Sequence, residues 1–243
     1  MLLTVDNVSK SYRKGKNVLR DVSLAVGAGE IIGLVGESGS GKSTLSKLIM
    51  QLEAPEQGSI SLNGQLVTRH SRKAFYTDCQ LIFQNASAAL NPSWTVKEIL
   101  MEPLQKRKGN QDSHIRRMIE KVKLTEMHLR RRPSELSGGE RQRVNLLRSI
   151  LVEPKLLVCD EIVSNLDRLI QKEIIDLLIE LNREEGMAIL FISHDLQVVN
   201  YMCDRIYVLK DGEIVEESIK MESGFEFSHQ YSKKLFESIQ TGK

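Results

Sequence analysis

The residues best suited to chemistry form a glycine-rich loop with the pattern G-x-x-x-x-G-K-S, which begins at Gly36 and ends at Ser43. An apolar segment at residues 31–35 precedes the loop and is expected to be a strand. Glycines allow successive backbone N–H groups to surround an anion, and the positive end of a following helix strengthens the attraction. In such a loop Lys42 reaches the β and γ phosphates of a nucleotide, and the Ser43 hydroxyl holds Mg²⁺. The pattern therefore predicts a binding site for a nucleoside triphosphate.

A helix is predicted directly after the loop, as this chemistry requires. Apolar side chains recur at the i, i+3, i+4 and i+7 spacing of one helical face, at Leu45, Leu48, Ile49 and Leu52. We expect all four to be buried. The strand before the loop and the helix after it favour a nucleotide site over a simple glycine turn between two elements.

A pair of acidic residues, Asp160 and Glu161, ends the apolar segment LLVCDE. At the carboxyl end of a parallel strand, next to a phosphate loop, an aspartate can hold the magnesium shell. The adjacent glutamate can act as a general base toward the attacking water. Taken alone, such a pair is more commonly a solvated acidic turn. The phosphate loop elsewhere in the chain favours the catalytic interpretation.

Two further polar side chains follow predicted strands, His194 in FISHD and Gln84 after CQLIF. In isolation, a histidine or glutamine in such a position is more often structural. If these strands share one sheet, however, their ends point to the same crevice. His194 is then a candidate donor to the γ-phosphate or the water, and Gln84 is a candidate ligand of Mg²⁺ or water.

A second glycine-containing helix start occurs in LSGGERQR, at residues 136–143. Ser137 and Glu140 have the spacing of a capping box, and a predicted buried stripe follows at Val144, Leu147 and Leu151. A capping box does not need paired glycines. Bare backbone at a helix start is an anion cradle, so this segment is predicted to face a second anion.

The order of predicted elements favours an α/β fold. Short strands separated by turn signals fill the first 65 residues, and residues 91–153 have helical periodicity without a convincing strand. Two apolar runs follow, at residues 156–160 and 188–195, with a helix between them. This helix carries Gly186 as its expected end and an apolar face formed by Ile170, Ile174, Leu177, Leu178 and Leu181. Apolar strands alternating with helices are typical of a parallel sheet covered on both faces.

Composition excludes several other classes of protein. The net charge of the 243 residues is only +2, which gives no global basis for nucleic-acid binding. The basic runs at residues 105–108 and 129–133 are interpreted as solvated faces, with an acidic partner or a phospholipid surface as the alternative. Neither a disulfide framework nor a zinc site is indicated by the three separated cysteines, and no uncharged apolar run is long enough for a membrane span.

Taken in order, these motifs resemble the nucleotide-binding subunit of ABC transporters. The resemblance rests on the glycine loop, Gln84, LSGGERQR, LLVCDE, the SNLD segment at residues 164–167 and FISHD. It implies a P-loop NTPase core with a mostly parallel sheet, an N-terminal antiparallel β subdomain and an inserted helical subdomain. The implied boundaries are residues 1–85 and 154–243 for the nucleotide-binding core, and residues 86–153 for the helical subdomain.

The same resemblance implies roles for individual residues, with ATP and Mg²⁺ as the cofactors. The catalytic residues would be Glu161, His194 and Lys42, and the Mg²⁺ ligands Ser43, Gln84 and Asp160. Tyr12 would stack on adenine, Asp167 would lie at a dimer seam, and Gln84 would sense the membrane subunit. In a head-to-tail dimer, the signature residues Ser137, Gly138, Gly139 and Glu140 would cap the γ-phosphate held by the other subunit. ATP itself would contact Tyr12, Gly36, Glu37, Ser38, Gly39, Ser40, Gly41, Lys42, Ser43, Thr44 and Gln84.

A narrower resemblance, to the oligopeptide, dipeptide and nickel importer branch, comes from FQNASAALNPSWTV at residues 83–96 and SHQYSKKLFESI at residues 228–239. Gln230 stands where that branch usually has proline, which leaves peptides, nickel and other metal chelates open as cargo. The implied partners are a second ATPase subunit, two membrane permeases and, indirectly, an extracytoplasmic solute-binding protein, at the cytoplasmic face of the membrane. The alternative is a soluble ABC ATPase that acts on ribosomes or DNA.

Overall fold

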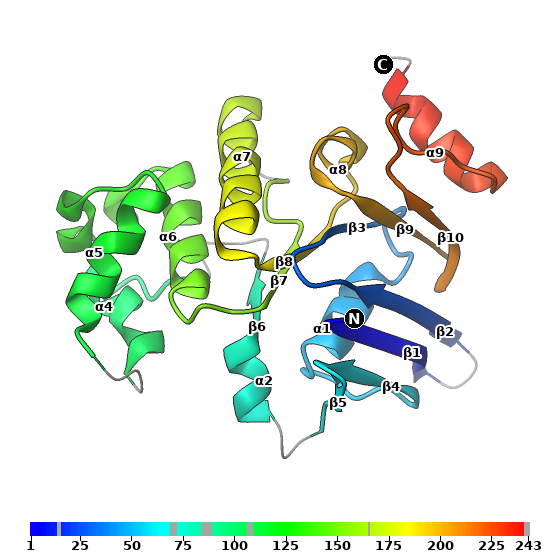
Figure 1. Ribbon diagram of the computed structural model, residues 1–243, viewed down its shortest axis with the longest axis horizontal. Coiled ribbons are helices and arrows are strands. Elements are labelled where there is room, and N and C mark those ends of the chain that lie inside the picture. Colours follow the sequence, from blue (N-terminus) through cyan, green and yellow to red (C-terminus); the bar gives the residue numbers. More distant parts are fainter. Residues whose placement is uncertain (14–15, 69–71, 84–88, 106–108, 165, 241–243) are drawn as a thin grey trace.

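The computed structural model describes residues 1–13, 16–68, 72–83, 89–105, 109–164 and 166–240 (Figure 1). Gln84, Asn165 and most of the basic run at residues 105–108 lie outside the described residues. Of the other basic run, Arg130 and Arg132 are exposed, as expected for a solvated face, while Arg131 lies 3.7 Å from the carboxylate of Glu140. No helix within the described ranges is long and apolar enough to cross a membrane.

The N-terminal part of the chain forms a four-stranded antiparallel sheet in the order β2-β1-β4-β5. Alternation of apolar and polar residues along β1 buries Leu3 and Val5, and an irregularity between Val5 and Val8 lets Val8 be buried as well. The Asn63-Gly64 turn reverses the chain between β4 and β5, with both residues at positive φ. The strands are β1 (Leu3–Arg13), β2 (Lys16–Val26), β4 (Gln57–Leu62) and β5 (Gln65–Leu66).

A six-stranded sheet forms the centre of the molecule, in the order β10-β9-β3-β8-β7-β6. The five strands from β9 to β6 pair in parallel, and β10 pairs with β9 in the antiparallel sense. The predicted mostly parallel sheet is therefore confirmed, whereas β9 and β10 were not anticipated. The strands are β3 (Ile31–Val35), β6 (Cys79–Ile82), β7 (Leu156–Asp160), β8 (Ala188–Ile192), β9 (Arg205–Lys210) and β10 (Glu213–Ile219).

Side chains of the central strands alternate between two separate cores. In β8, Ile189 and Phe191 enter one core, while Leu190 and Ile192 enter the other. The first core also contains helices α7 (Arg168–Glu185) and α8 (Leu196–Met202) and the apolar residues of the helical region between β6 and β7. The second contains helix α1 (Lys42–Ile49) and the antiparallel sheet. Because both faces are covered, the central strands are apolar along their whole length.

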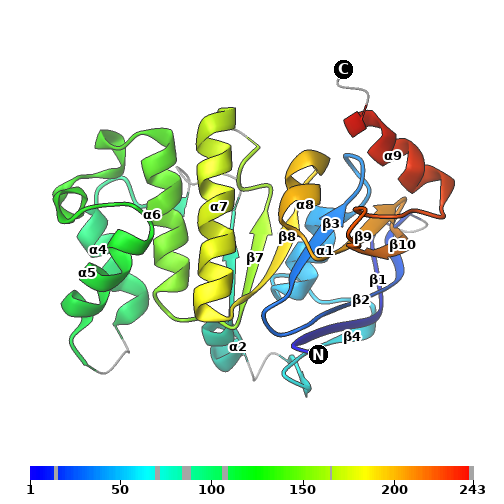
Figure 2. The ribbon, with the colours of Figure 1, turned by 45° about the horizontal axis from the view of Figure 1, so that its top comes forward.

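Helices cover the two faces unequally (Figures 1 and 2). The segments 89–105 and 109–153 contain helices and turns and no strand, as predicted, and their apolar side chains join the core beneath α7. Figure 2 shows α4, α5 and α6 gathered on the side of α7 away from α1. The helices are α1 (Lys42–Ile49), α2 (Arg72–Asp78), α4 (Val96–Met101), α5 (Gln111–Lys121), α6 (Gly138–Ile150), α7 (Arg168–Glu185), α8 (Leu196–Met202) and α9 (Gln230–Gln240), with 3₁₀ turns η1 (Glu102–Leu104), η2 (Glu126–Arg130) and η3 (Pro133–Glu135).

The structure tests one predicted helical face and one predicted helix end. In α1, Leu45, Leu48 and Ile49 are fully buried, but Leu52 is 52% exposed, so its predicted burial is wrong. The helix ends at Ile49, and the chain turns through a positive φ of 54° at Gln51, which carries Leu52 out of the helical register. In α7, Gly186 adopts the left-handed conformation at the C-terminal end, as predicted.

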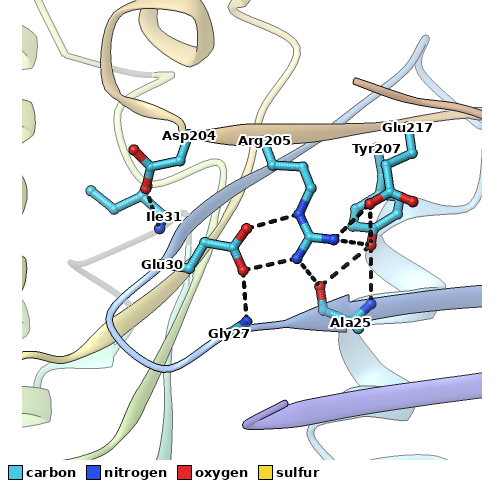
Figure 3. A network of polar contacts seen from close by, with 8 residues as sticks. All are labelled: Ala25, Gly27, Glu30, Ile31, Asp204, Arg205, Tyr207 and Glu217. Carbon is cyan, nitrogen blue, oxygen red and sulfur yellow. Dashed lines mark hydrogen bonds and ion pairs between the residues drawn. The ribbon is translucent and has the colours of Figure 1, made fainter. Parts of the chain in front are cut away.

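A polar network built on Arg205 joins the two sheets (Figure 3). Its guanidinium donates to both carboxylate oxygens of Glu30 at 2.8 Å, to Glu217 at 2.6 Å and to the Ala25 carbonyl at 3.0 Å. Glu30 in turn accepts a hydrogen bond from the Gly27 N–H at 2.7 Å. The network therefore fixes the end of β2 and the start of β3 against β9 and β10.

Replacing this cation should destabilise the fold. Arg205→Met keeps the apolar stem but leaves the partly buried Glu30 carboxylate without its cation, which should cost about 2–4 kcal/mol in the free energy of unfolding. Urea denaturation measures the loss. Arg20→Met is the matched control, because Arg20 pairs with Glu213 at 3.0 Å with both side chains about half exposed, and its loss should cost less than about 1 kcal/mol. Equal losses in the two variants would contradict the role given to Arg205.

Candidate nucleotide site

The ends of three adjacent strands bring the predicted chemical groups to one edge of the central sheet. Ile192 at the end of β8 pairs with Leu34 of β3 on one side and with Asp160 of β7 on the other. Past the strand ends, the Ser193 N–H donates to the Leu34 carbonyl at 3.2 Å, and the Glu161 N–H donates to the Ile192 carbonyl at 3.0 Å. The glycine loop, the acidic pair and His194 therefore leave the sheet side by side.

The loop between β3 and α1 depends on glycine at two positions. A Cβ atom at Gly36 would lie 2.1 Å from the Leu209 carbonyl oxygen of β9. At Gly41, with φ of 114°, it would lie 2.7 Å from Leu19 and 3.0 Å from the carbonyl of Val18. Gly39 also has positive φ, but nothing lies within 4 Å of its added Cβ, so this part of the loop faces open space. The backbone is thus pressed against β2 and β9 on one side and left bare on the other.

Lys42 places a buried positive charge inside this loop. Its side chain is only 5% exposed, and its ammonium donates to the carbonyls of Gly36 at 2.7 Å and Glu37 at 2.9 Å. Within the described residues it forms no ion pair, and burial lowers its pKa while Glu161 and Asp160 oppose that shift. Since a buried charge is costly without a counter-charge, the loop is suited to an anion such as a phosphate chain.

The loop and β7 also supply oxygen atoms of the kind that Mg²⁺ prefers. Ser43 is exposed in the first turn of α1, and Asp160 is partly buried at the end of β7. Burial raises the pKa of Asp160, against the opposing effects of a hydrogen bond from Ser46 and the charge of Lys42. A divalent cation would lower it again, because it favours the charged carboxylate. A hydroxyl, a partly buried carboxylate and a bare anion cradle fit a magnesium–nucleotide complex; Gln84, the third predicted ligand, lies outside the described residues.

Glu161 and His194 lie together at the exposed rim of the site. Glu161 Oε1 is 3.4 Å from His194 Nδ1, and the two side chains are 25% and 59% exposed. Glu161 has a positive φ of 52°, a left-handed conformation that is uncommon for a residue with a side chain. The N–H contact to β8 holds this residue just past the strand end. A carboxylate and an imidazole so placed are suited to orienting and deprotonating a water molecule.

Tyr12 lies near the start of α1, on β1. Its ring is 51% exposed, and its hydroxyl donates to Glu53 at 2.7 Å. The pKa of the phenol is raised, first by burial and then by Glu53, whereas hydrogen bonding with Thr44 opposes the shift. An exposed aromatic face close to the end of the glycine loop is compatible with stacking on a base.

The signature segment begins α6 with the predicted capping box. The Glu140 N–H donates to Ser137 Oγ at 3.2 Å, and the Ser137 N–H donates to the Glu140 carboxylate at 2.6 Å. That backbone bond lowers the pKa of Glu140, and His128, 3.0 Å away, adds to the effect. The two glycines differ in their surroundings: Gly138 is exposed with nothing near its added Cβ, whereas Gly139 packs against Ile170.

The structure does not unite this segment with the phosphate loop. Among the described residues, no hydrogen bond or ion pair joins Ser137, Gly138, Gly139 or Glu140 to the residues of the loop. Asp167, predicted for a dimer seam, caps α7 by accepting from the N–H groups of Leu169 and Ile170 at 3.1 Å each. One chain therefore brings together Lys42, Asp160, Glu161 and His194, and within the described residues the signature segment makes no hydrogen bond or ion pair with the loop.

One contact of the loop had no signal in the sequence pattern. The Glu37 N–H donates to the hydroxyl of Tyr231, which lies 194 positions later in α9, at 3.2 Å. Nothing in the spacing of residues could have paired these two segments. Only the packing of α9 near the end of β9 makes the contact visible.

The fold and the site together define a P-loop ATP-binding protein, and comparison with known proteins identifies its family. The sequence model described as "ABC transporter" matches residues 19–164. The chain therefore belongs to the ABC transporter family, as the ATP-binding subunit that couples ATP hydrolysis to transport. It is similar to the nickel import ATP-binding protein NikE of Escherichia coli O6:K15:H31 (strain 536 / UPEC), with 44% identity over 233 residues, covering 90% of this chain and 87% of the relative. The NikE of Escherichia coli (strain K12) is 43% identical with the same coverage.

Two solved structures share the architecture. The chain matches cbiO1 from Clostridium perfringens, part of the ABC transporter complex cbiONQ, with a TM-score of 0.82 and 24% identity, covering 89% of this chain and 87% of that one. This likeness supports the fold alone. The ATP-binding cassette MJ0796, in a dimeric post-hydrolysis state bound to ADP and Pi, has a TM-score of 0.79 and 28% identity, covering 90% of this chain and 98% of that one.

The unequal surroundings of the two signature glycines lead to a stability prediction. An alanine at 139 would place its Cβ 2.9 Å from Ile170 Cγ2, so Gly139→Ala should lower the free energy of unfolding by about 1–3 kcal/mol. Gly138→Ala adds a methyl group in open space and should be neutral or stabilising by up to about 1 kcal/mol. Urea denaturation of the two variants separates these outcomes. A larger loss at Gly138 than at Gly139 would contradict the packing described.

Proposed function

We propose that this chain is the energy-coupling ATPase of an ABC importer for nickel. The observation that carries the proposal is the buried Lys42 ammonium, whose partners in the described residues are the carbonyls of Gly36 and Glu37. A nucleotide phosphate would provide the counter-charge. The similarity to nickel import ATP-binding proteins supplies the direction of transport and the cargo.

In this proposal each group of the site has a defined role. Lys42 and the loop amides hold the β and γ phosphates, and Tyr12 stacks on the adenine. Glu161 acts as the general base, with His194 holding its carboxylate and contacting the γ-phosphate. Phosphoryl transfer needs mainly positioning and charge stabilisation, which fixed groups supply. Mg²⁺, held by Ser43, Asp160 and Gln84, would neutralise charge on the phosphates.

The signature segment acts on the nucleotide of a second subunit. Ser137 and Gly138 are exposed at the positive end of α6, a position suited to an anion. Among the described residues, no hydrogen bond or ion pair joins them to the loop of their own chain, so their partner site is best supplied by another chain. The dimeric state of the similar cassette MJ0796 supports this arrangement. Asp167 would lie close to the seam.

The membrane partners complete the assembly. Residues 86–153 would form the helical subdomain that, with Gln84, transmits closure of the dimer to two permease subunits at the cytoplasmic face. The remaining residues, 1–85 and 154–243, would form the nucleotide-binding core. Cargo would be captured outside the cell by a solute-binding protein and recognised in the permeases.

Replacing the proposed base separates binding from hydrolysis. Glu161→Gln keeps the size of the side chain and its hydrogen-bonding capacity but cannot accept the proton of the attacking water. ATP turnover should fall by about 10²–10⁴-fold. ATP should still bind and should hold two subunits together. Phosphate release and size-exclusion chromatography, with the second cassette present if assembly needs it, measure the two properties.

Glu180→Gln is the control for that experiment, because it makes the same chemical change on the exposed face of α7. It should leave turnover and assembly unchanged. Wild-type phosphate release by Glu161→Gln would remove Glu161 from the mechanism.

The cargo is tested in the assembled transporter. Membrane vesicles containing the complex should accumulate radioactive nickel only when ATP is supplied on the cytoplasmic side. Lys42→Ala should abolish uptake because the buried counter-charge to the phosphates is lost. Lys47→Ala, on the same helix but half exposed, should retain it. Uptake of dipeptides with no uptake of nickel would assign the transporter to peptides instead.

A further inference from the structure

Three hydrogen bonds meet at the backbone of Glu37 in the phosphate loop. Its carbonyl accepts from the Lys42 ammonium at 2.9 Å and from the Ser40 N–H at 3.2 Å. Its N–H donates to the Tyr231 hydroxyl at 3.2 Å. The Glu37 carbonyl therefore binds the lysine, while the Glu37 N–H, in the preceding peptide group, is held by α9. The carbonyl of that preceding group, Gly36, also accepts from Lys42, at 2.7 Å.

Tyr231 is itself held by Lys210 and His229. The Lys210 ammonium, at the end of β9, lies 5.1 Å from the centre of its ring. His229 packs edge-on against the ring at 6.5 Å, and its Nδ1 accepts from the Tyr231 N–H at 3.1 Å. These contacts orient the side chain so that its hydroxyl meets the loop.

The start of α9 is fixed to the central sheet in turn. Glu216 of β10 accepts from the N–H of Ser228 at 2.5 Å and from the N–H of His229 at 3.1 Å. These bonds hold the two residues before α9 in place. A continuous set of contacts therefore runs from β10, through the start of α9, to the amide of Glu37.

We propose that Tyr231 is a positioning residue that keeps the phosphate loop in its nucleotide-binding conformation, so that docking of α9 sets the affinity for ATP. The inference rests on the proposed ATPase function. Without the hydroxyl, the Glu37 N–H loses its partner, and the loop gains access to conformations in which the Glu37 carbonyl no longer orients Lys42. Affinity falls in proportion to the fraction of molecules that retain the competent loop.

Tyr231→Phe isolates this effect, because it removes one oxygen atom and keeps the ring over Lys210. Loss of a hydrogen bond of about 0.5–1.5 kcal/mol corresponds to about a 2- to 10-fold rise in the dissociation constant for ATP. Calorimetric titration of the full chain with ATP measures it. The turnover number at saturating ATP should change by less than about 2-fold, because bound ATP itself holds the loop. Hydrogen exchange at the Glu37 amide should become faster, while exchange in β3 stays unchanged.

Tyr201→Phe is the matched control. It removes a tyrosine hydroxyl that donates to Asp176 at 2.9 Å, between α8 and α7 and outside the proposed nucleotide site. Its ATP affinity should equal that of the wild type. An unchanged affinity in Tyr231→Phe, or an equal loss in both variants, would overturn the role of Tyr231. Absence of ATP binding in the wild-type chain would instead overturn the proposed function, so the two failures are distinguishable.

Discussion

The burial of the Lys42 ammonium is the constraint around which the nucleotide site is organised. A cation in this position is tolerated because carbonyl oxygens of Gly36 and Glu37 surround it and because acidic groups lie further off, at the end of β7. The loop can follow this path only with glycine at positions 36 and 41. A side chain there would collide with the carbonyl groups of Leu209 and Val18. The charge and the glycines therefore depend on each other.

The same edge of the sheet explains why the site is open on one side. In the site that we propose, Lys42, Glu161 and His194 of a single subunit lie on one side of the phosphates, and the rim residues Glu161 and His194 are partly exposed. The start of α6 has the opposite character: an exposed helix end with a bare glycine, whose partial positive charge attracts an anion. In the dimer that we propose, these two surfaces complement each other across the pair of subunits. Hydrolysis would then depend on assembly.

The C-terminal part of the chain supports the site from beyond the edge of the parallel strands. Arg205 at the start of β9 joins the two sheets. At the other end of the same strand, the Leu209 carbonyl packs against Gly36 of the phosphate loop. Tyr231 extends this support to the loop amide. The elements β9, β10 and α9 therefore act on the geometry of the site as well as completing the fold.

The sequence alone determined the groups whose chemistry is local. A strand, a glycine loop and a helix are consecutive in the chain, and the capping box of Ser137 and Glu140 spans one helical turn, so spacing was sufficient to predict both. The prediction that Leu52 is buried was wrong, because a periodic pattern does not show where a helix ends. The order of strands, the neighbours that force glycine at position 36 and the contact of Tyr231 with Glu37 join segments far apart in the chain. Only tertiary packing could decide these features, because the contacts that stabilise them form between segments that folding brings together.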